Sequence, residues 1–293
     1  MDTHTTMAPR RPPQMTDAYV RGKVREALDE DLGPERRDAT TAATVDAGAR
    51  AEAALIAKGA GVLAGIPVAA EVFRQVDAGA ELEELVPDGA AVAPGDVVAR
   101  VRGPLQALLM AERTALNFVQ QLSGVATLTR RYVEAAGGGA AVLDTRKTAA
   151  GLRPLQRYAV ALGGGVNHRY DLAGAVLVKD NHVAAAGGTA AAVRRARSSG
   201  LPVEVEVETL DELDAALEAG AEAVLLDNMA PETVADAVRR CRGRAVLEVS
   251  GGVTLATIGA YAATRVDRIS VGALTHSAPA LDVSMEVTAT WHS

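Results

Sequence analysis

The feature that most constrains the fold is a regular alternation of short apolar runs and amphipathic segments between residues 140 and 271. The apolar runs, which we interpret as buried strands, are AAVLD, GAVLV, PVEVEV, EAVLL, RAVLEVS and DRISV. The segments between them, such as RPLQRYAVAL and PETVADAVRR, have helical periodicity. Strands that alternate with helices at this spacing are joined by crossover connections and form parallel sheets. Six units fall short of the eight of a closed barrel, so we predict an α/β fold with an open or incomplete α/β barrel of about six parallel strands.

A smaller N-terminal α/β sandwich domain is expected over residues 16–123. Thr16 or Asp17 can cap a first helix, glycine turns interrupt strands between residues 51 and 65, and a helix fits residues 67–76. Two further short strands are expected at LEELV and DVVARVRG.

A strong amphipathic helix is predicted over residues 104–121, and Ser123 with Gly124 is expected to end it. A second helix then leads into the barrel domain, residues 124–279. The last segment, residues 280–293, is expected to return to the first domain.

The composition excludes several classes of protein. Hydrophobic residues make up 48% of the chain but aromatic residues only 3%, so Ala, Val and Leu must fill the core. The net charge of −7 argues against nucleic-acid binding by the whole surface, and no apolar run approaches the ~20 residues of a membrane span. Residues 1–15 lack the apolar core of a signal peptide and are expected to form a disordered tail. The single cysteine, Cys241, has no partner for an internal disulfide, which fits a cytoplasmic location.

Basic side chains gather in the first strand, helix, strand unit of the barrel. They are Arg146, Lys147, Arg153, Arg157, His168, Arg169 and Lys179. Ligands of α/β folds bind at the carboxyl ends of the strands, and in an acidic protein a basic cluster there indicates a small anionic ligand. A guanidinium group donates two parallel hydrogen bonds to a carboxylate, so one arginine per carboxylate suits a dicarboxylate. Arg153 and Arg157 lie on the following helix, and the pattern leaves open that they are solvated.

Carboxylates follow at the next two strand ends. Glu206 and Asp227 are expected to share a cleft, in which they can bind Mg²⁺ directly or through water and accept hydrogen bonds from ribose hydroxyls. They would also stabilise positive charge that develops at the anomeric carbon of a sugar. Glu204 has the same strand parity as Glu206. The alternative is that Glu206 simply forms an ion pair with Lys179.

Glycine-rich turns follow the last two strands, SGGVT at Ser250 and VGALTH at Gly272. Backbone amides and a helix N-terminus can converge on a phosphate there, and α/β barrels repeatedly bind phosphate after their late strands. We therefore expect the first turn to open a helix at a phosphate site. A plain turn is the alternative for Gly251 and Gly252, and His276 can equally be a surface histidine.

Six short motifs occur in one order along the chain: DTRKT, GGGVNHRYDL, VLVKDNH, EVEVE, LLDN and SGGV. Together they resemble the quinolinate phosphoribosyltransferase family, the carboxylating nicotinate-nucleotide pyrophosphorylases, and the likeness extends from about residue 27 to about residue 285. The resemblance implies a glycosyltransferase of NAD biosynthesis that transfers phosphoribosyl from 5-phosphoribosyl 1-pyrophosphate to quinolinate. The products would be nicotinate mononucleotide, pyrophosphate and CO2, with Mg²⁺ as the cofactor.

The resemblance also implies roles for individual residues. Quinolinate would be bound by Arg146, Lys147, His168 and Arg169, and by Arg113 of an ERTALNF motif that reaches across from the neighbouring subunit of a homodimer. Phosphoribosyl pyrophosphate would be bound by Lys179, Glu206, Asp227, Ser250, Gly251, Gly272 and His276. The reaction would depend on Lys147, Lys179, Glu206 and Asp227, of which Glu206 and Asp227 would hold the Mg²⁺. From the residues alone, Arg113 has a simpler interpretation as the ion-pair partner of Glu112.

Two other functions stay open. Another phosphoribosyltransferase on the same scaffold would act on nicotinate or a different ring acid. A non-catalytic phosphate or metabolite-binding barrel would bind ligands without turnover, although it has no need to keep Lys147, Lys179, Glu206 and Asp227 together.

Overall fold

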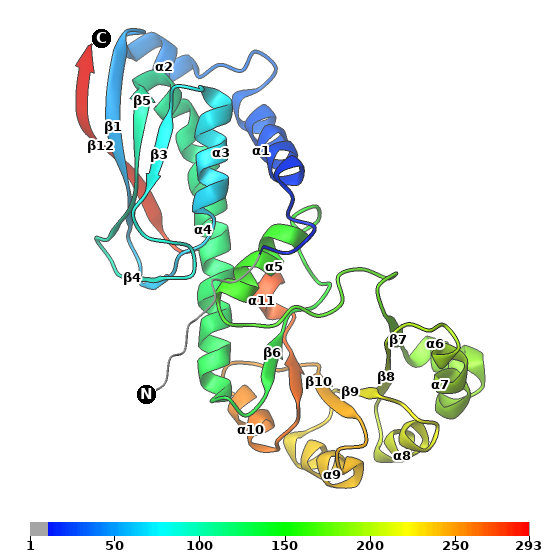
Figure 1. The fold of residues 1–293 in the computed structure, drawn as a ribbon. Helices are drawn as coiled ribbons and strands as arrows, with labels where there is room; N and C mark the ends of the chain where they lie inside the picture. Colours follow the sequence, from blue (N-terminus) through cyan, green and yellow to red (C-terminus); the bar gives the residue numbers. More distant parts are fainter. Residues whose placement is uncertain (1–10, 293) are drawn as a thin grey trace, which may run out of the picture. The chain divides into compact units, whose positions relative to one another are not determined.

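The structure is a computed structural model that describes residues 11–292. Residues 1–10, the larger part of the expected tail, lie outside the described residues. The described chain divides into two units, which Figure 1 shows with their elements. The first unit consists of the residues up to Leu128, Gly151–Gly163 and those from Ala278 onwards, and the second consists of Thr129–Ala150 and Gly164–Ser277. Residues 151–163, which the sequence assigns to the barrel domain, therefore group with the first unit.

The first unit is built on a four-stranded antiparallel sheet in the order β12-β1-β5-β3. Its strands are β1 (Ala49–Ala57), β3 (Glu81–Glu84), β5 (Val97–Pro104) and β12 (Val283–His292). Alternate residues of β1 are fully buried, as expected for a sheet with one face on a core. β12 comes from the end of the chain and pairs with β1 along its whole length, so the C-terminal segment completes this sheet.

The other elements of the first unit are α1 (Asp17–Leu32), α2 (Ala39–Thr44), α3 (Ile66–Val76), α5 (Arg153–Leu162), and the paired short strands β2 (Gly61–Val62) and β4 (Ala91–Val92). Thr16 caps α1 as predicted, because its hydroxyl accepts a hydrogen bond of 3.1 Å from the Tyr19 N–H. Val68, Val72 and Phe73 are buried on α3, which confirms the predicted helix.

The long helix α4 (Leu105–Ala136) overturns one prediction. The sequence pattern predicts that Ser123 and Gly124 end this helix, but the helix continues through both. The Ser123 hydroxyl is buried and exchanges two hydrogen bonds with the backbone of Ala64, of 2.9 and 3.1 Å. A Cβ on Gly124 would lie 2.1 Å from the Pro279 carbonyl oxygen. The two small residues therefore serve close packing, not helix termination.

We expect Gly124→Ala to destabilise the protein by about 1–3 kcal/mol, the usual cost of forcing extra atoms into a packed core. Helix propensity alone would favour alanine over glycine by about 1 kcal/mol, so the sign of the change separates the two effects. Gly22→Ala is the matched control, since Gly22 lies on α1 with no atom within 4 Å of an added Cβ. Urea unfolding of both variants measures the change, and a more stable Gly124→Ala protein would contradict the close approach to Pro279.

The second unit contains a six-stranded sheet in the order β6-β11-β10-β9-β8-β7, and all neighbouring strands are parallel. The strands are β6 (Ala141–Leu143), β7 (Val176–Val178), β8 (Val203–Val207), β9 (Ala223–Asp227), β10 (Val246–Ser250) and β11 (Arg268–Ser270). They coincide with the six apolar runs of the sequence. Because β6 and β7 form the two edges and do not pair with each other, the prediction of an open α/β barrel is confirmed.

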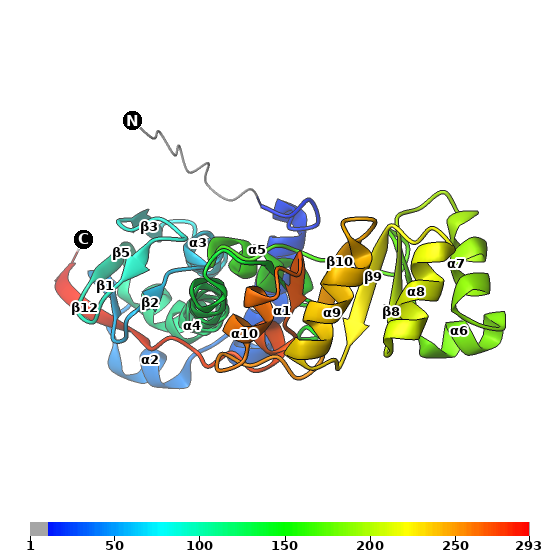
Figure 2. The ribbon, with the colours of Figure 1, turned by 90° about the horizontal axis from the view of Figure 1, so that it is seen from below.

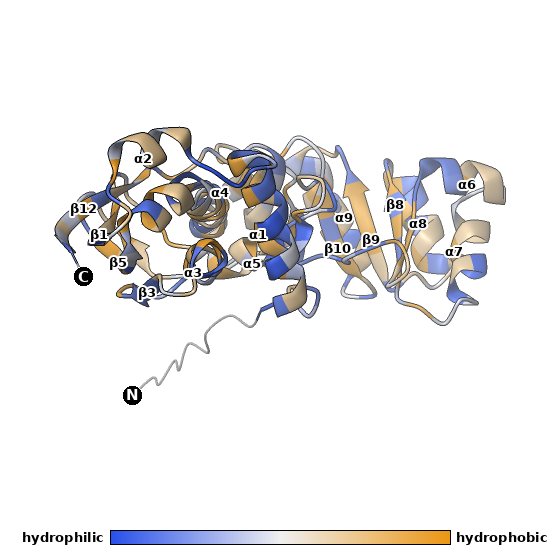
Figure 3. Ribbon diagram, turned by 90° about the horizontal axis from the view of Figure 1, so that it is seen from above, coloured by the Kyte–Doolittle hydropathy of each residue, from blue (hydrophilic) through white to orange (hydrophobic). Residues whose placement is uncertain are grey.

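The helices of the second unit are α6 (Asp180–Ala186), α7 (Thr189–Arg197), α8 (Leu210–Glu218), α9 (Pro231–Cys241), α10 (Ile258–Ala263) and α11 (Ala273–His276). α8 and α9 lie beside β8 and β9 (Figure 2), and these strands are mainly hydrophobic, as the orange colour in Figure 3 shows. Short aliphatic side chains such as Val205, Val224 and Leu226 fill the core, as the low aromatic content requires. α6 was not predicted and buries none of its residues. None of the helices within residues 11–292 has both the length and the apolar character of a membrane span.

Candidate active site

A cavity of about 600 Å³ opens at the carboxyl ends of the parallel strands, within the second unit. Lys179 directly follows β7, Glu206 is next to last in β8, and Asp227 and Ser250 end β9 and β10. Because parallel strands end at one edge of a sheet, residues far apart in the sequence meet there. Nine of the twelve residues that the sequence predicts for the site line the cavity: Arg146, Lys147, His168, Arg169, Lys179, Glu206, Asp227, Ser250 and Gly251.

The middle of the cavity carries two carboxylates and a lysine. Lys179 Nζ lies 2.5 Å from Glu206 Oε2, so the ion pair that the sequence left as an alternative is present. Burial raises the pKa of Asp227, and the negative charge of Glu206 raises it further, whereas Lys179 and Lys147 lower it. The charges of Glu206, Lys179 and Lys147 therefore all act on Asp227 within this cavity.

The turn after β10 is packed against Asn228. Gly251 and Gly252 have φ values of +95° and +63°, in the region that favours glycine. A Cβ on Gly251 would lie 2.1 Å from Asn228 Oδ1, and the Asn228 N–H donates to the Ser250 carbonyl at 2.9 Å. The expectation that this turn opens a helix is wrong, because α10 begins only at Ile258. The groups available to an anion here are therefore backbone N–H groups and the Ser250 hydroxyl.

Gly272 and His276 lie beside Lys147, although they do not line the cavity themselves. A Cβ on Gly272 would lie 3.1 Å from His276 Nε2 and 3.3 Å from Lys147 Cδ. The Thr275 hydroxyl donates to the Lys147 carbonyl at 2.7 Å. The short helix α11 thus holds the backbone of a residue that does line the cavity.

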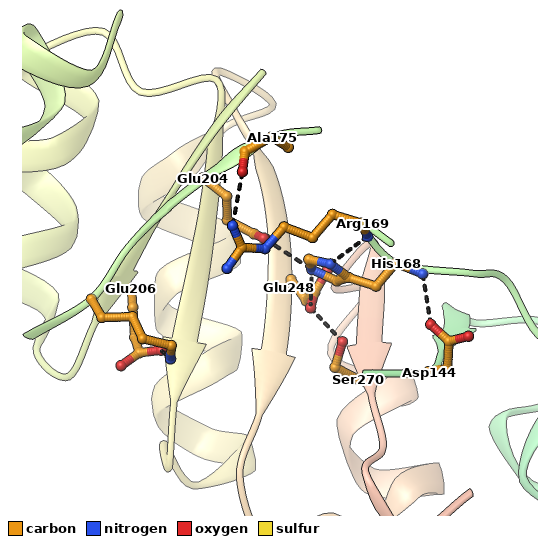
Figure 4. A network of polar contacts seen from close by, with 9 residues as sticks. Asp144, His168, Arg169, Ala175, Glu204, Glu206, Glu248 and Ser270 are labelled. Carbon is orange, nitrogen blue, oxygen red and sulfur yellow. Dashed lines mark hydrogen bonds and ion pairs between the residues drawn. The ribbon is translucent and has the colours of Figure 1, made fainter. Parts of the chain in front are cut away.

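Another part of the cavity is basic. Burial lowers the pKa of Arg169, and the charge of Arg146 lowers it further, so the two guanidinium groups are close enough to repel each other. Arg169 Nη1 donates to the Ala175 carbonyl at 2.8 Å (Figure 4). Two neighbouring guanidinium groups are suited to an anion with two carboxylates.

His168 is fixed in this part of the cavity by four contacts (Figure 4). Its backbone N–H donates to Asp144 Oδ1 at 2.8 Å, and its Nδ1 accepts from the Arg169 N–H at 2.7 Å. Its Nε2 lies 3.1 Å from Glu204 Oε2 and 3.4 Å from Glu248 Oε1. Burial lowers the pKa of His168, but the hydrogen bonds with Glu204 and Glu248 outweigh burial and raise the pKa to about 9. Both ring nitrogens therefore have partners within the protein.

Models of one family match most of the chain. The N-terminal domain of quinolinate phosphoribosyl transferase matches residues 38–123, and the C-terminal domain matches residues 125–286. The chain belongs to the quinolinate phosphoribosyltransferase family. The resemblance read from the six motifs is thereby confirmed.

Individual relatives agree with this family. The nicotinate-nucleotide pyrophosphorylase (carboxylating) of Mycobacterium leprae is 44% identical over 276 residues, which cover 92% of this chain and 97% of that protein. The crystal structure of NadC from Streptococcus pyogenes has a TM-score of 0.90 and 40% identity, and covers 95% of this chain and 99% of that chain. The nicotinate-nucleotide pyrophosphorylase of Francisella tularensis has the same TM-score of 0.90 and 40% identity, with 97% and 100% covered.

Four polar residues of this phosphoribosyltransferase cavity are not among the predicted site residues, Thr145, Asn228, Glu248 and Ser270. Glu248 lies within β10 and is completely buried, and the Ser270 hydroxyl donates to its Oε1. The signal that could have found Glu248 is strand parity, because it lies on the same side of β10 as Ser250. A glutamate inside an apolar strand is also rare without a buried partner.

Two of the simpler interpretations of charged residues fail. Arg113 is exposed on α4, and within residues 11–292 no ion pair joins it to Glu112. Burial raises the pKa of Glu112, and the charge of Arg113 only opposes this shift. Arg157 is 6% exposed, so it is not a solvated charge, and Arg153 is half-buried.

Proposed function

We propose that this family member transfers phosphoribosyl from 5-phosphoribosyl 1-pyrophosphate to the ring nitrogen of quinolinate, with loss of the 2-carboxylate as CO2. The observation that carries the proposal is the sorting of charge around one cavity. Arginines line one part of the cavity, and carboxylates with Lys179 line another. A glycine turn lines the cavity at the end of β10. This order matches a dicarboxylate, a ribose and a phosphate in a row.

In this proposal Arg146, Arg169 and Lys147 bind the two carboxylates of quinolinate, and His168 belongs to the same subsite. Each carboxylate accepts paired hydrogen bonds from one guanidinium group. The 5-phosphate meets Ser250 and the N–H groups of the Gly251 turn, with Gly272 and His276 nearby. Lys179, Glu206 and Asp227 face the ribose and the pyrophosphate.

The residues fit Mg²⁺ as the cofactor. Glu206 and Asp227 offer hard oxygen ligands at neighbouring strand ends, where burial and then the charge of Glu206 raise the pKa of Asp227. When bound, Mg²⁺ would neutralise charge on the pyrophosphate. The donor set of one or two carboxylates suits an ion that also keeps waters and substrate oxygens.

The chain's own residues position the reactants and complement charge. The bond from the anomeric carbon to pyrophosphate breaks, the ring nitrogen donates its electron pair to that carbon, and Glu206 and Asp227 stabilise the positive charge on the sugar. The alkylated ring nitrogen is cationic, so it can hold the electron pair left at C2 when CO2 departs, before C2 takes up a proton. Lys147 and Lys179 stabilise the anionic groups throughout, and no protein nucleophile is needed.

We also propose a homodimer in which Arg113 completes the site of the neighbouring subunit. The exposure of Arg113 on α4 supports this, because a guanidinium group without an ion-pair role is available to a ligand. The β7 edge of the barrel also exposes apolar surface, since Leu172 is 68% exposed and α6 buries no residue. A partner subunit would cover such surface. The single cysteine is buried and free, which supports a cytoplasmic location.

The decisive experiment incubates the purified protein with phosphoribosyl pyrophosphate, Mg²⁺ and either quinolinate or nicotinate. We expect nicotinate mononucleotide and one CO2 per turnover with quinolinate, and neither product with nicotinate. Treatment with EDTA should abolish the activity. Turnover of nicotinate would instead indicate a phosphoribosyltransferase for another ring acid. Binding of both substrates without product would indicate a metabolite-binding barrel.

A further inference from the structure

Two glutamates are buried inside the barrel although the proposed reaction gives them no role. Glu248 is 0% exposed in β10, and Glu204 is 8% exposed in β8. Burying a carboxylate is costly unless other groups compensate it. One oxygen of each, Glu204 Oε1 and Glu248 Oε2, has no hydrogen-bond partner among residues 11–292. Glutamates retained at such a cost indicate a specific task.

The contacts of these glutamates converge on one side chain. Glu248 Oε1 accepts from the Ser270 hydroxyl and lies 3.4 Å from His168 Nε2. Glu204 Oε2 lies 3.1 Å from the same Nε2 (Figure 4). Glutamates of β8 and β10 thus hold the imidazole from the barrel interior, and Ser270 of β11 holds one of these glutamates.

The two carboxylates hold Nε2 of His168 in either protonation state of the ring, whereas Nδ1 can accept a hydrogen bond only in the neutral ring. Carboxylates only accept hydrogen bonds, so Nε2 must carry a hydrogen. The opposite nitrogen, Nδ1, faces the Arg169 N–H at 2.7 Å, which links the ring to the backbone of the next residue. Fixing the imidazole ring therefore also fixes the backbone N–H of Arg169.

The segment that carries His168 joins the two edges of the open barrel. Val166 forms a bridge with Leu143 of β6, and Val176 begins β7 at the other edge. No strand pairing holds the residues between them, so polar contacts must hold this stretch of the described chain. The carboxylates of Asp144, Glu204 and Glu248 supply them at His168.

We propose that Glu248, fixed by Ser270, is a positioning residue that holds His168 and thereby places Arg169 at the ring-acid end of the cavity. This inference rests on the proposed function, because it assigns Arg169 to the quinolinate subsite. Glu248 itself does not act on the substrate. Ser270 and His168 both contact Oε1 of Glu248, so a glutamine could keep an oxygen there but not the negative charge that strengthens both hydrogen bonds.

Glu248→Gln tests the proposal through the two substrates separately. We expect the KM for quinolinate, and the Kd for the non-reacting ring dicarboxylate phthalate, to rise about tenfold, the effect of replacing a hydrogen bond to a charged group by one to a neutral group. The KM for phosphoribosyl pyrophosphate should stay within about twofold, since the Ser250 turn does not depend on His168. Ser270→Ala, which keeps the carboxylate, should shift the same two constants in the same direction but less, and it serves as the test if Glu248→Gln does not fold.

Leu247→Ala is the matched control for destabilisation. Leu247 is the neighbour of Glu248 in β10 and is buried on the opposite side of the strand. Its loss should lower the Tm without separating the two KM values. Equal changes in both KM values for Glu248→Gln, following the Tm, would overturn the positioning role.

A second readout follows the imidazole directly. The ¹⁵N shifts of His168, assigned by comparison with His168→Gln, should show a hydrogen on Nε2 in the wild type and a changed pattern in Glu248→Gln. One possible metal-ligand atom each of His168, Glu204 and Glu248 lies within 4.8 Å of the others. Zn²⁺ is therefore added in parallel to EDTA-treated protein, to test whether these residues bind a metal ion. Loss of the Nε2 hydrogen with tight Zn²⁺ binding would overturn the proposal in favour of a metal site.

The failure of this inference can be told from the failure of the proposed function. A wild type that neither binds phthalate nor consumes quinolinate would remove the proposed function, and the role of Glu248 in it as well. A wild type that consumes quinolinate, with a Glu248→Gln variant of unchanged quinolinate KM and phthalate Kd, would remove the inference alone.

Discussion

Arg146→Ala is expected to lower kcat/KM for quinolinate by about a thousandfold, because in the proposed complex Arg146 donates two charge-assisted hydrogen bonds of about 1.5–3 kcal/mol each to a carboxylate. Neighbouring Arg169 cannot replace it, since Arg169 already donates to the Ala175 carbonyl. Steady-state kinetics with the CO2 assay measures the loss. Binding of phosphoribosyl pyrophosphate should remain, because its proposed phosphate contacts lie at Ser250 and Gly251.

Arg146→Lys is the control for geometry. It keeps the positive charge but cannot form the paired hydrogen bonds, so we expect activity between that of the alanine variant and the wild type. The Tm of both variants should stay near that of the wild type, because the side chain is only half-buried. A strongly lowered Tm for Arg146→Ala would show that Arg146 supports the fold and not a ligand.

Mixing Arg113→Ala with Arg146→Ala protein is expected to restore activity that neither variant has alone. If Arg113 serves the neighbouring subunit, a hybrid dimer has one site with both arginines and one site with neither. Random exchange makes half of the dimers hybrids, so about one quarter of the wild-type activity should return. The rise follows subunit exchange, which a tag on one variant makes visible.

A mixture of Arg146→Ala and Arg169→Ala protein is the matched control for the hybrid experiment. Both residues line the same cavity of one chain, so every site of the hybrid lacks one arginine and activity should stay low. Recovery in this control would indicate contamination or an unexpected exchange of segments. No recovery in the Arg113 mixture, despite visible exchange, would place Arg113 outside the site.

Much of the fold was predictable because its signals are local. Each apolar run of the barrel became a strand, and the helices over 153–162 and 231–241 coincide with the predicted segments. Strand ends then located nine cavity residues, since the carboxyl ends of parallel strands share one edge whatever the details of packing. The glycine turn at Gly251 was also visible, although the helix expected after it begins later, at Ile258.

Other features depend on residues that meet only after folding. The pair Ser123 and Gly124 has the composition of a helix end, yet α4 continues because Ala64 and Pro279 pack against these small residues. α6 was missed because it buries no apolar stripe that a periodic pattern would show. The sequence left open whether Arg157 is a solvated charge, and the structure buries it.

The sequence by itself determined the alternation of strands and helices, the family, and the side of the barrel on which charged groups gather. Apolar periodicity and the order of strands along the chain can be read from neighbouring residues. Only the tertiary structure decided which of those groups face one another. The ion pair of Lys179 with Glu206, the contacts of Glu204 and Glu248 with His168, and the hydrogen bond from Ser270 to Glu248 join residues that are far apart in the sequence. Such contacts depend on the register and curvature of the sheet, and no local pattern of residues specifies these before the chain has folded.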